Sequence, residues 1–374
     1  MSVVPAVRFQ RNSAMDTARG IAVIGMIILH LVPLDGLGTA VSELMAGTFA
    51  ALFFILAGMS WAIQADRVGS IQGSYRWVMR RSLALLVLGL LLHGFVWSTE
   101  VLTPFAIMQA PVLWIRSKGR RAMVVAIFAL LAAVLVGAVA FAGYAQTDWK
   151  ADGSHYADST FGWVTLRYLL IDGNYPVIPW LAFPLLGLLF VRGGEVLQGR
   201  MRLWLGVGST LGASLWLLTN WTADHADRLG EAAKYVSTTW VPTTVPFMLL
   251  KGSVAVAVIA GLAVWHQGTV LPRVCHVVAC VGRASLTHYL AHICLVFAPL
   301  RLFYPGEDWP LSVGLAASLL YCAVAIPLSA LWFRSHKRGP LEQLLAWISG
   351  GLPRHAPPPG APSKLQSDNS HGEG

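Results

Sequence analysis

The stretch Arg19-Gly-Ile-Ala-Val-Ile-Gly-Met-Ile-Ile-Leu-His30 decides the fold, because two basic side chains end an otherwise apolar run. On an α-helix this spacing places Arg19 and His30 on one face, about 16 Å apart along the axis. The run is typical of a membrane span with Arg19 near the surface and His30 about halfway through the hydrocarbon. An ionisable group at that depth is costly and favours a functional site, although a neighbouring helix could also satisfy His30.

The composition of the whole chain favours an integral membrane protein. Of its 374 residues, 56% are hydrophobic and 12% are charged, whereas roughly a quarter of the residues in soluble domains are charged. Nothing resembles a cleavable signal peptide, because further apolar segments follow the first one directly. We therefore expect an all-α, polytopic helical bundle in the cell membrane.

Hydropathy predicts about ten transmembrane helices. The fourth is the weakest, because Pro104 and Pro111 interrupt it and it follows the third after a short turn. The predicted spans are residues 17–34, 46–64, 82–98, 100–115, 122–144, 176–191, 203–221, 243–265, 281–303 and 311–333.

Basic residues predict the orientation of this bundle. The loops on one side carry Arg8, Arg11, Arg67, Arg76, Arg80, Arg81, Arg116, Lys118, Arg120, Arg121, Arg192, Arg200, Arg202, Arg334, Lys337 and Arg338. The loops on the other side, including the long segments 145–175 and 222–242, are acidic or nearly neutral. By the positive-inside rule, both termini are cytoplasmic.

Four regions follow from this orientation. They are a cytoplasmic N-terminal segment (1–16), the transmembrane bundle (17–335), an amphipathic cytoplasmic helix (336–350) and a disordered tail (351–374). The net charge of +9 is then a consequence of topology. We expect no nucleic-acid partner, because no soluble basic face with interleaved aromatic residues is present. The sequence leaves a homodimer open.

Several further basic and acidic residues are candidates for an inner site. His93 lies at a depth similar to that of His30, so both could line one cavity between the first and third spans, unless His93 only bonds a neighbouring helix. Asp16 either caps the first helix or orients Arg19. Arg80 and Arg81 are topology signals that could also bind the phosphates of an anionic cofactor. Lys251, inside a span, either snorkels to the surface or joins this site.

The outer side offers a second group of candidates. Glu100 stands at the outer end of the third and fourth spans, and Asp172, Tyr175 and Trp180 lead from the long outer loop into the sixth. The aromatic pair either belongs to the interfacial belt or forms a platform for a substrate, with Asp172 accepting its hydrogen bonds.

Metal-binding patterns are weak in this sequence. His288 and His292 have an i, i+4 spacing but no neighbouring carboxylate or cysteine, so we expect no metal site. The four cysteines lie in or beside late spans and predict neither a disulfide nor a metal site.

These residues resemble known families of transmembrane acyltransferases. An Arg, ten residues and a His also open their first helix, and Phe53-Phe-Ile-Leu-Ala-Gly58 is similar to a run of the acyltransferase-3 family, with Ala57 in place of Ser. The remainder resembles the bacterial family called domain of unknown function 418, a relative of heparan-α-glucosaminide N-acetyltransferase. The similar segments are residues 80–93, 100–106, 174–187, 282–289 and 339–342, and they span roughly residues 15–348.

The departures from these families concern the catalytic residues. The lysosomal branch typically has Asn at the position of His30 and its catalytic His in the next outer loop, but residues 31–92 contain no His here. If the chemistry is shared, His30 or His93 must take the catalytic role. Glu100 stands where the family usually has Asp.

The resemblance implies an enzyme that moves an acyl group, most simply acetyl, from a cytoplasmic acyl-CoA such as acetyl-CoA. Arg19, Arg80, Arg81, Asp16 and Lys251 would hold the donor, and His30 would act as base or acyl carrier. The acceptor would be a hydroxyl or amine of an envelope glycan, a lipid or a small metabolite, contacted by Glu100, Asp172, Tyr175 and Trp180. A proton-linked transporter and a non-catalytic membrane protein remain as alternatives.

A cysteine-accessibility map tests the orientation. We expect single cysteines placed in residues 145–175 to react with a membrane-impermeant thiol reagent added outside the cell. Reaction only from the cytoplasmic side would contradict the predicted topology.

Overall fold

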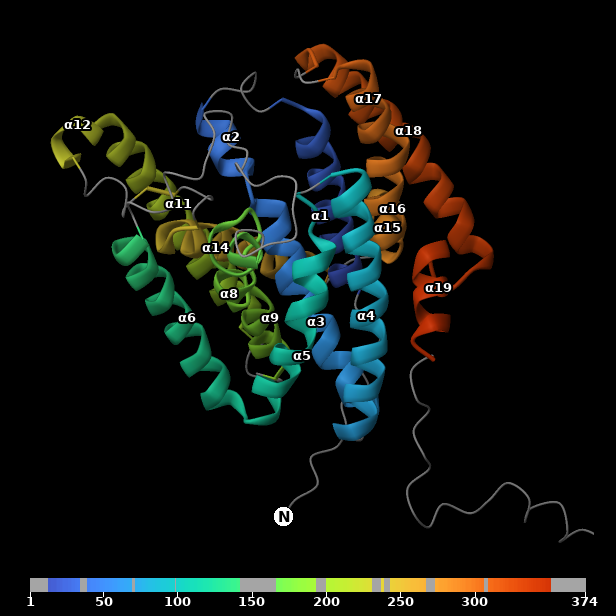
Figure 1. The fold of residues 1–374 in the computed structure, drawn as a ribbon, viewed down its shortest axis with the longest axis horizontal. Helices are drawn as coiled ribbons and strands as arrows, with labels where there is room; N and C mark the ends of the chain where they lie inside the picture. The colour runs from blue at the N-terminus through green and yellow to red at the C-terminus, as the bar shows by residue number, and fades with distance from the viewer. Residues whose placement is uncertain are drawn as a thin grey trace, which may run out of the picture.

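The computed structural model describes residues 13–33, 39–68, 71–97, 99–141, 166–192, 200–230, 237–238, 243–266, 273–305 and 309–350. Within these ranges the chain is helical and contains no strand (Figure 1). Residues 1–12 of the predicted N-terminal segment (1–16), the predicted tail (351–374) and most of the predicted outer loop at 145–175 lie outside them. The all-α prediction is confirmed.

The helices in chain order are α1 (Ser13–Leu31), α2 (Thr39–Met45), α3 (Thr48–Val68), α4 (Ile71–Phe95), α5 (Leu102–Ser117), α6 (Arg120–Phe141), η2 (Tyr168–Asp172), α8 (Val177–Trp180), α9 (Ala182–Arg192), α11 (Met201–Asp224), α12 (Ala226–Leu229), α14 (Val245–His266), α15 (Arg273–Arg283), α16 (Ser285–His292), η4 (Ile293–Phe297), α17 (Ala298–Phe303), α18 (Leu311–Ser335) and α19 (Pro340–Ile348). Both η2 and η4 are π-helical.

Eight helical segments in the described ranges are long and apolar enough to cross a membrane. They are Ser13–Leu31, Thr48–Asp66, Tyr75–Phe95, Arg120–Gly137, Tyr168–Val191, Val245–His266, Ser285–Phe303 and Leu311–Ser335. The other two predicted spans coincide with α5, which has only 16 residues, and α11, which carries Arg202, Asn220 and Asp224. The count of ten transmembrane helices and their orientation stay predictions. The eight apolar segments support a multi-pass membrane protein.

The outer helices expose apolar side chains. In Figure 1, α6 and α18 lie on opposite sides of the bundle. Their exposed residues include Val125, Phe128 and Val136 on α6, and Leu319, Leu320 and Leu328 on α18. Such surfaces are unfavourable in water, and they suit contact with lipid chains.

Helix α1 occupies the interior and contacts α3, α14, α15, α16 and α18. Its closest approach is to α15, where a Cβ built on Gly282 would lie 2.0 Å from the carbonyl oxygen of Asp16. A Cβ on Gly20 would lie 2.1 Å from the carbonyl oxygen of Val278. Only glycine allows this backbone contact, which is a common way of packing helices in membranes.

The end of α1 sets the position of His30. Pro33 lacks an N–H group and restricts the backbone before it, so the helix stops at Leu31. The carbonyl oxygen of Leu31 accepts a hydrogen bond from the indole of Trp309 at 2.5 Å. His30 therefore lies in the last helical turn, on a well-anchored helix end.

At the other end of the chain, a helix occupies the segment predicted to be amphipathic. It is α19, which packs against α4 and α16 and buries Leu345. Its exposed face includes Leu344 and Trp347. Its location on the inner membrane surface stays a prediction.

Replacing Gly282 tests the α1–α15 contact. We expect Gly282→Ala to lower the free energy of unfolding by at least about 1–3 kcal/mol, because the added methyl overlaps a backbone carbonyl. Thermal unfolding of the detergent-purified protein measures this effect. The matched control is Gly137→Ala, since a Cβ there meets nothing within 4 Å. Equal unfolding temperatures for both variants would contradict the contact.

Candidate active site

The side chain of His30 is paired with His292 from α16. Its Nδ1 lies 2.8 Å from Nε2 of His292, and the two rings are nearly parallel, with an interplanar angle of 18°. The edge of Trp97, which follows α4, packs against His30 with ring centroids 4.5 Å apart. The structure thus joins the predicted catalytic histidine to a residue 262 positions away in sequence.

A second set of polar contacts fixes the helix that carries His292. The ring of His292 bonds the carbonyl oxygen of His288 through Nδ1 at 2.9 Å. The His288 ring contacts the hydroxyl of Tyr321 at 3.0 Å and that of Ser329 at 2.7 Å, both on α18. Both histidines are buried. The i, i+4 spacing of these histidines is a weak metal-binding pattern, and in the described structure their nitrogens contact side chains and a backbone carbonyl.

Tyr289 connects this pair to the predicted substrate residues. Its ring packs against that of His292, with centroids 5.7 Å apart, and its hydroxyl accepts a hydrogen bond from the N–H of Val101 at 3.0 Å. It interacts electrostatically with Glu100 and Tyr175. Sequence reasoning did not select Tyr289, although it lies on the similar segment 282–289, and it considered His292 only as half of a weak metal-binding pattern.

Glu100 is buried and makes local backbone contacts. Its carboxylate accepts hydrogen bonds from the N–H groups of Leu102 at 2.5 Å and Thr103 at 3.0 Å. These N–H groups belong to the first turn of α5, where no helical acceptor is available. His93 interacts electrostatically with Glu100. The structure therefore groups His93 and Glu100 near Tyr289, whereas the direct partners of His30 are His292 and Trp97.

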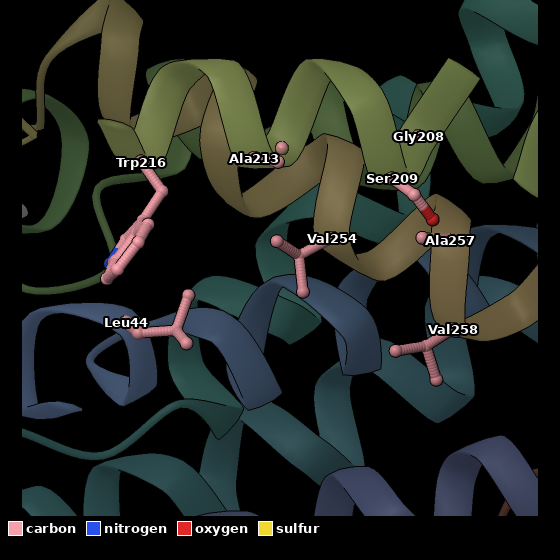
Figure 2. Close-up of a pocket in the computed structure, with 9 residues that line it drawn as sticks. Leu44, Gly208, Ser209, Ala213, Trp216, Val254, Ala257 and Val258 are labelled. Carbon is pink, nitrogen blue, oxygen red and sulfur yellow. The ribbon is translucent and has the colours of Figure 1, made fainter. Parts of the chain in front are cut away.

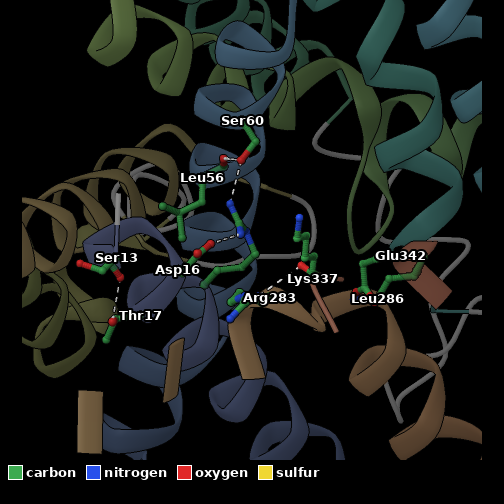
Figure 3. A network of polar contacts seen from close by, with 10 residues as sticks. Ser13, Asp16, Thr17, Leu56, Ser60, Arg283, Leu286, Lys337 and Glu342 are labelled. Carbon is green, nitrogen blue, oxygen red and sulfur yellow. Dashed lines mark hydrogen bonds and ion pairs between the residues drawn. The ribbon is translucent and has the colours of Figure 1, made fainter. Parts of the chain in front are cut away.

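Arg19 occupies the opposite end of α1. It donates to the carboxylate of Asp16 at 2.9 Å and to the hydroxyl of Ser60 at 2.8 Å (Figure 3). Asp16 thus orients Arg19, one of the two alternatives that the sequence left open. The guanidinium is partly buried, so its charge is held in a fixed position on the face of α1 that leads to His30.

Further charged groups surround this end of the bundle. Arg81 interacts electrostatically with Arg19, Arg338 and Glu342. Glu342 on α19 accepts a hydrogen bond from the N–H of Leu286 at 2.6 Å (Figure 3). It also accepts one from the hydroxyl of Thr287 at 2.7 Å. This carboxylate therefore satisfies the N-terminal turn of α16. Arg80 is exposed. The cluster has an excess of positive charge.

The remaining predicted residues lie in other contacts. Lys251 is fully buried on α14 and donates to the carbonyl oxygen of Leu44 at 3.0 Å, near the start of α3. Ser60, which contacts Arg19, lies twelve residues beyond the start of α3, about 18 Å along the axis. The structure thus does not bring Lys251 together with Arg19.

Asp172, Tyr175 and Trp180 form a group around η2 and α8. Asp172 pairs with Arg167 at 2.9 Å, and Tyr175 packs edge-on against Trp180 with centroids 5.0 Å apart. Trp180 has no exposed area, and its indole donates to the hydroxyl of Thr243 at 3.2 Å. In this arrangement Trp180 packs the core, and Tyr175 is the member that reaches toward Tyr289.

A separate apolar pocket lies between α11 and α14 (Figure 2). It has a volume of about 470 Å³. Its lining consists of Leu44, Gly208, Ser209, Gly212, Ala213, Trp216, Val254, Ala257 and Val258. The predicted catalytic residues do not line it, and its apolar walls suit hydrocarbon better than a charged donor.

Comparisons with known proteins cover almost the whole described bundle. Residues 11–201 match the family model "Heparan-alpha-glucosaminide N-acetyltransferase, catalytic". Residues 189–351 match "Protein of unknown function (DUF418)". Neither the curated proteins nor the solved structures gave a match. The first model includes Arg19, His30, His93 and Glu100, and the second includes His288, Tyr289 and His292.

Substitution of Glu100 separates its helix-capping contacts from substrate binding. We expect Glu100→Ala to lower the free energy of unfolding by about 1–2 kcal/mol, as loss of a helix cap does. Glu100→Gln should lose less, because its amide oxygen still accepts hydrogen bonds. Thermal unfolding measures both variants. An unchanged unfolding temperature for Glu100→Ala would show that the capping contacts are unimportant and would favour a role in substrate binding.

Proposed function

Because this chain belongs to the heparan-alpha-glucosaminide N-acetyltransferase catalytic family, we propose that it is a membrane acyltransferase. It would transfer an acyl group, most simply acetyl, from a cytoplasmic thioester such as acetyl-CoA to a hydroxyl or amine. The observation that carries this proposal is the arrangement along α1, with the buried Asp16–Arg19 pair at one end and the hydrogen-bonded His30 at the other.

The charged cluster supports a donor site at the end of the bundle where α1 begins. Coenzyme A carries phosphate groups, and guanidinium groups bind phosphate through charge-assisted hydrogen bonds. Arg81 lies within electrostatic range of Arg19, Arg338 and Glu342. The extended arm of coenzyme A would then follow α1 from Arg19 toward His30, bringing the thioester into the apolar part of the protein.

His30 supplies the acid–base chemistry of the transfer. In a direct reaction, one imidazole nitrogen takes the proton from the acceptor hydroxyl or amine as that group attacks the thioester carbonyl. The carbon–sulfur bond then breaks, and the same nitrogen returns the proton to the leaving thiolate, giving coenzyme A and the acylated acceptor. In the alternative two-step reaction, the nitrogen carries the acyl group before the acceptor takes it.

The cluster around Tyr289 supports an acceptor site beside this centre. Glu100 and Tyr175 interact electrostatically with Tyr289, whose ring packs on His292. Polar groups of this kind suit an acceptor rich in hydroxyl groups. We propose an envelope glycan, a lipid headgroup or a small metabolite as acceptor, and the cell membrane as location.

The contacts favour this enzyme over a proton-linked transporter. A transporter would need His30, His93 and Lys251 along one path. The structure instead pairs His30 with His292, places His93 near Glu100, and bonds Lys251 to the carbonyl oxygen of Leu44. These three groups thus belong to separate contacts.

Replacing His30 tests the proposed function. We expect His30→Ala to reduce acetyl-CoA turnover by the purified protein at least about 100-fold, because the acid–base group is lost. Chromatographic measurement of coenzyme A released in the presence of total cell lipid and glycan extract gives the rate. The matched control, His276→Ala, removes an exposed histidine on α15 and should keep wild-type turnover. Wild-type turnover by a folded His30→Ala variant would refute the assignment.

A further inference from the structure

We infer that His292 is a positioning residue that fixes His30 as the Nδ1–H tautomer and leaves Nε2 of His30 as the basic nitrogen. The tautomer follows from the contacts alone. Its consequence for catalysis rests on the function proposed above.

The first step concerns the protonation of His292. Its Nδ1 lies 2.9 Å from the carbonyl oxygen of His288. A carbonyl oxygen only accepts hydrogen bonds, so this nitrogen must carry the proton. The opposite tautomer would place a lone pair against a carbonyl lone pair at the same distance. In the neutral ring, Nε2 of His292 is consequently an acceptor.

The second step transfers this constraint to His30. Nε2 of His292 lies 2.8 Å from Nδ1 of His30, a separation that requires a proton between the two nitrogens. Because His292 offers a lone pair there, Nδ1 of His30 must be the donor. Neutral His30 then carries its free lone pair on Nε2, and in the described part of the chain this nitrogen has no hydrogen-bond partner.

The third step is that the surroundings hold both rings in place. His292 has no exposed area, and the hydroxyls of Tyr321 and Ser329 hold the His288 ring one turn before it. Glu342 satisfies the N–H of Leu286 at the start of the same helix. Trp97 also packs against the His30 ring, with centroids 4.5 Å apart. Rotation of either ring would lose these contacts.

His292 has the same role as the orienting residue of a catalytic triad, which is a buried acceptor that selects the tautomer of the catalytic histidine. When Nε2 of His30 takes up a proton, its Nδ1–H continues to donate to His292. The acceptor here is a neutral imidazole. It orients His30 without introducing a buried negative charge.

Nitrogen-15 NMR of the histidine-labelled protein tests the tautomer directly. His30 signals are assigned by their loss in His30→Asn. We expect Nδ1 of His30 to be protonated in the wild type, and a mixture of tautomers in His292→Ala. A wild-type His30 protonated on Nε2, or an unchanged tautomer in His292→Ala, would overturn the inference.

Kinetics test the consequence for catalysis. We expect His292→Ala to lower kcat for acetyl-CoA about 10- to 100-fold, the usual effect of losing an orienting partner, with an unchanged donor KM. His292→Gln should recover part of kcat, because its amide oxygen can accept from Nδ1 of His30. An unchanged kcat in His292→Ala would refute the positioning role. If the wild type showed the expected tautomer but no acetyl-CoA turnover, the proposed function would fail while the tautomer assignment would stand.

Discussion

The backbone contact between α1 and α15 at Gly20 and Gly282 is the constraint on which the site depends. It fixes where α15 crosses α1, and the chain continues from α15 directly into α16. His30 lies ten positions after Gly20, and His292 lies ten positions after Gly282. Equal lengths of chain therefore lead from the shared contact to the shared hydrogen bond. A larger side chain at either glycine would shift α16 and separate the two imidazoles.

Polar groups inside the bundle are costly unless they are paired, and the structure pairs those at both ends of α1. At one end of α1, Asp16 and Ser60 bind Arg19. At the other, His292 and Trp97 contact His30. Helix α16 links the two regions, because Glu342 caps its first turn near Arg81 and His292 lies in its last turn. The arginine cluster that we propose as the donor site and the position of His30 therefore both depend on one helix.

The sequence predicted the helical class and most spans, because hydropathy and loop charge are properties of residues that are consecutive in the chain. It also singled out Arg19 and His30 as candidate site residues, since both lie on one short segment with a regular spacing. The partner His292 could not be found this way, because its contact with His30 joins positions 262 residues apart. An i, i+4 histidine pair has several possible partners, and only the packing of α1 on α16 selects one of them.

The outer candidates show a second limit of sequence reasoning. A carboxylate before an apolar helix can bind a substrate or cap the helix, and the hydrogen bonds of Glu100 to Leu102 and Thr103 supply the capping contacts. Trp180 near a predicted membrane boundary was compatible with the interfacial belt or with a substrate platform. Its burial depends on aromatic neighbours such as Phe54 and Phe247 from distant helices, which no local pattern contains.

A histidine, in place of a carboxylate, is a reasonable orienting partner at this position. Burying an ionised carboxylate among apolar helices costs several kcal/mol unless it is paired with a cation. For Glu100, hydrogen bonds from backbone N–H groups at the start of α5 offset this cost. His30, in contrast, lies one residue from the end of its helix. There, the backbone offers carbonyl groups and no free N–H groups. A neutral imidazole that donates to a carbonyl and accepts from His30 suits this environment, so the helix ends themselves favour a His–His pair.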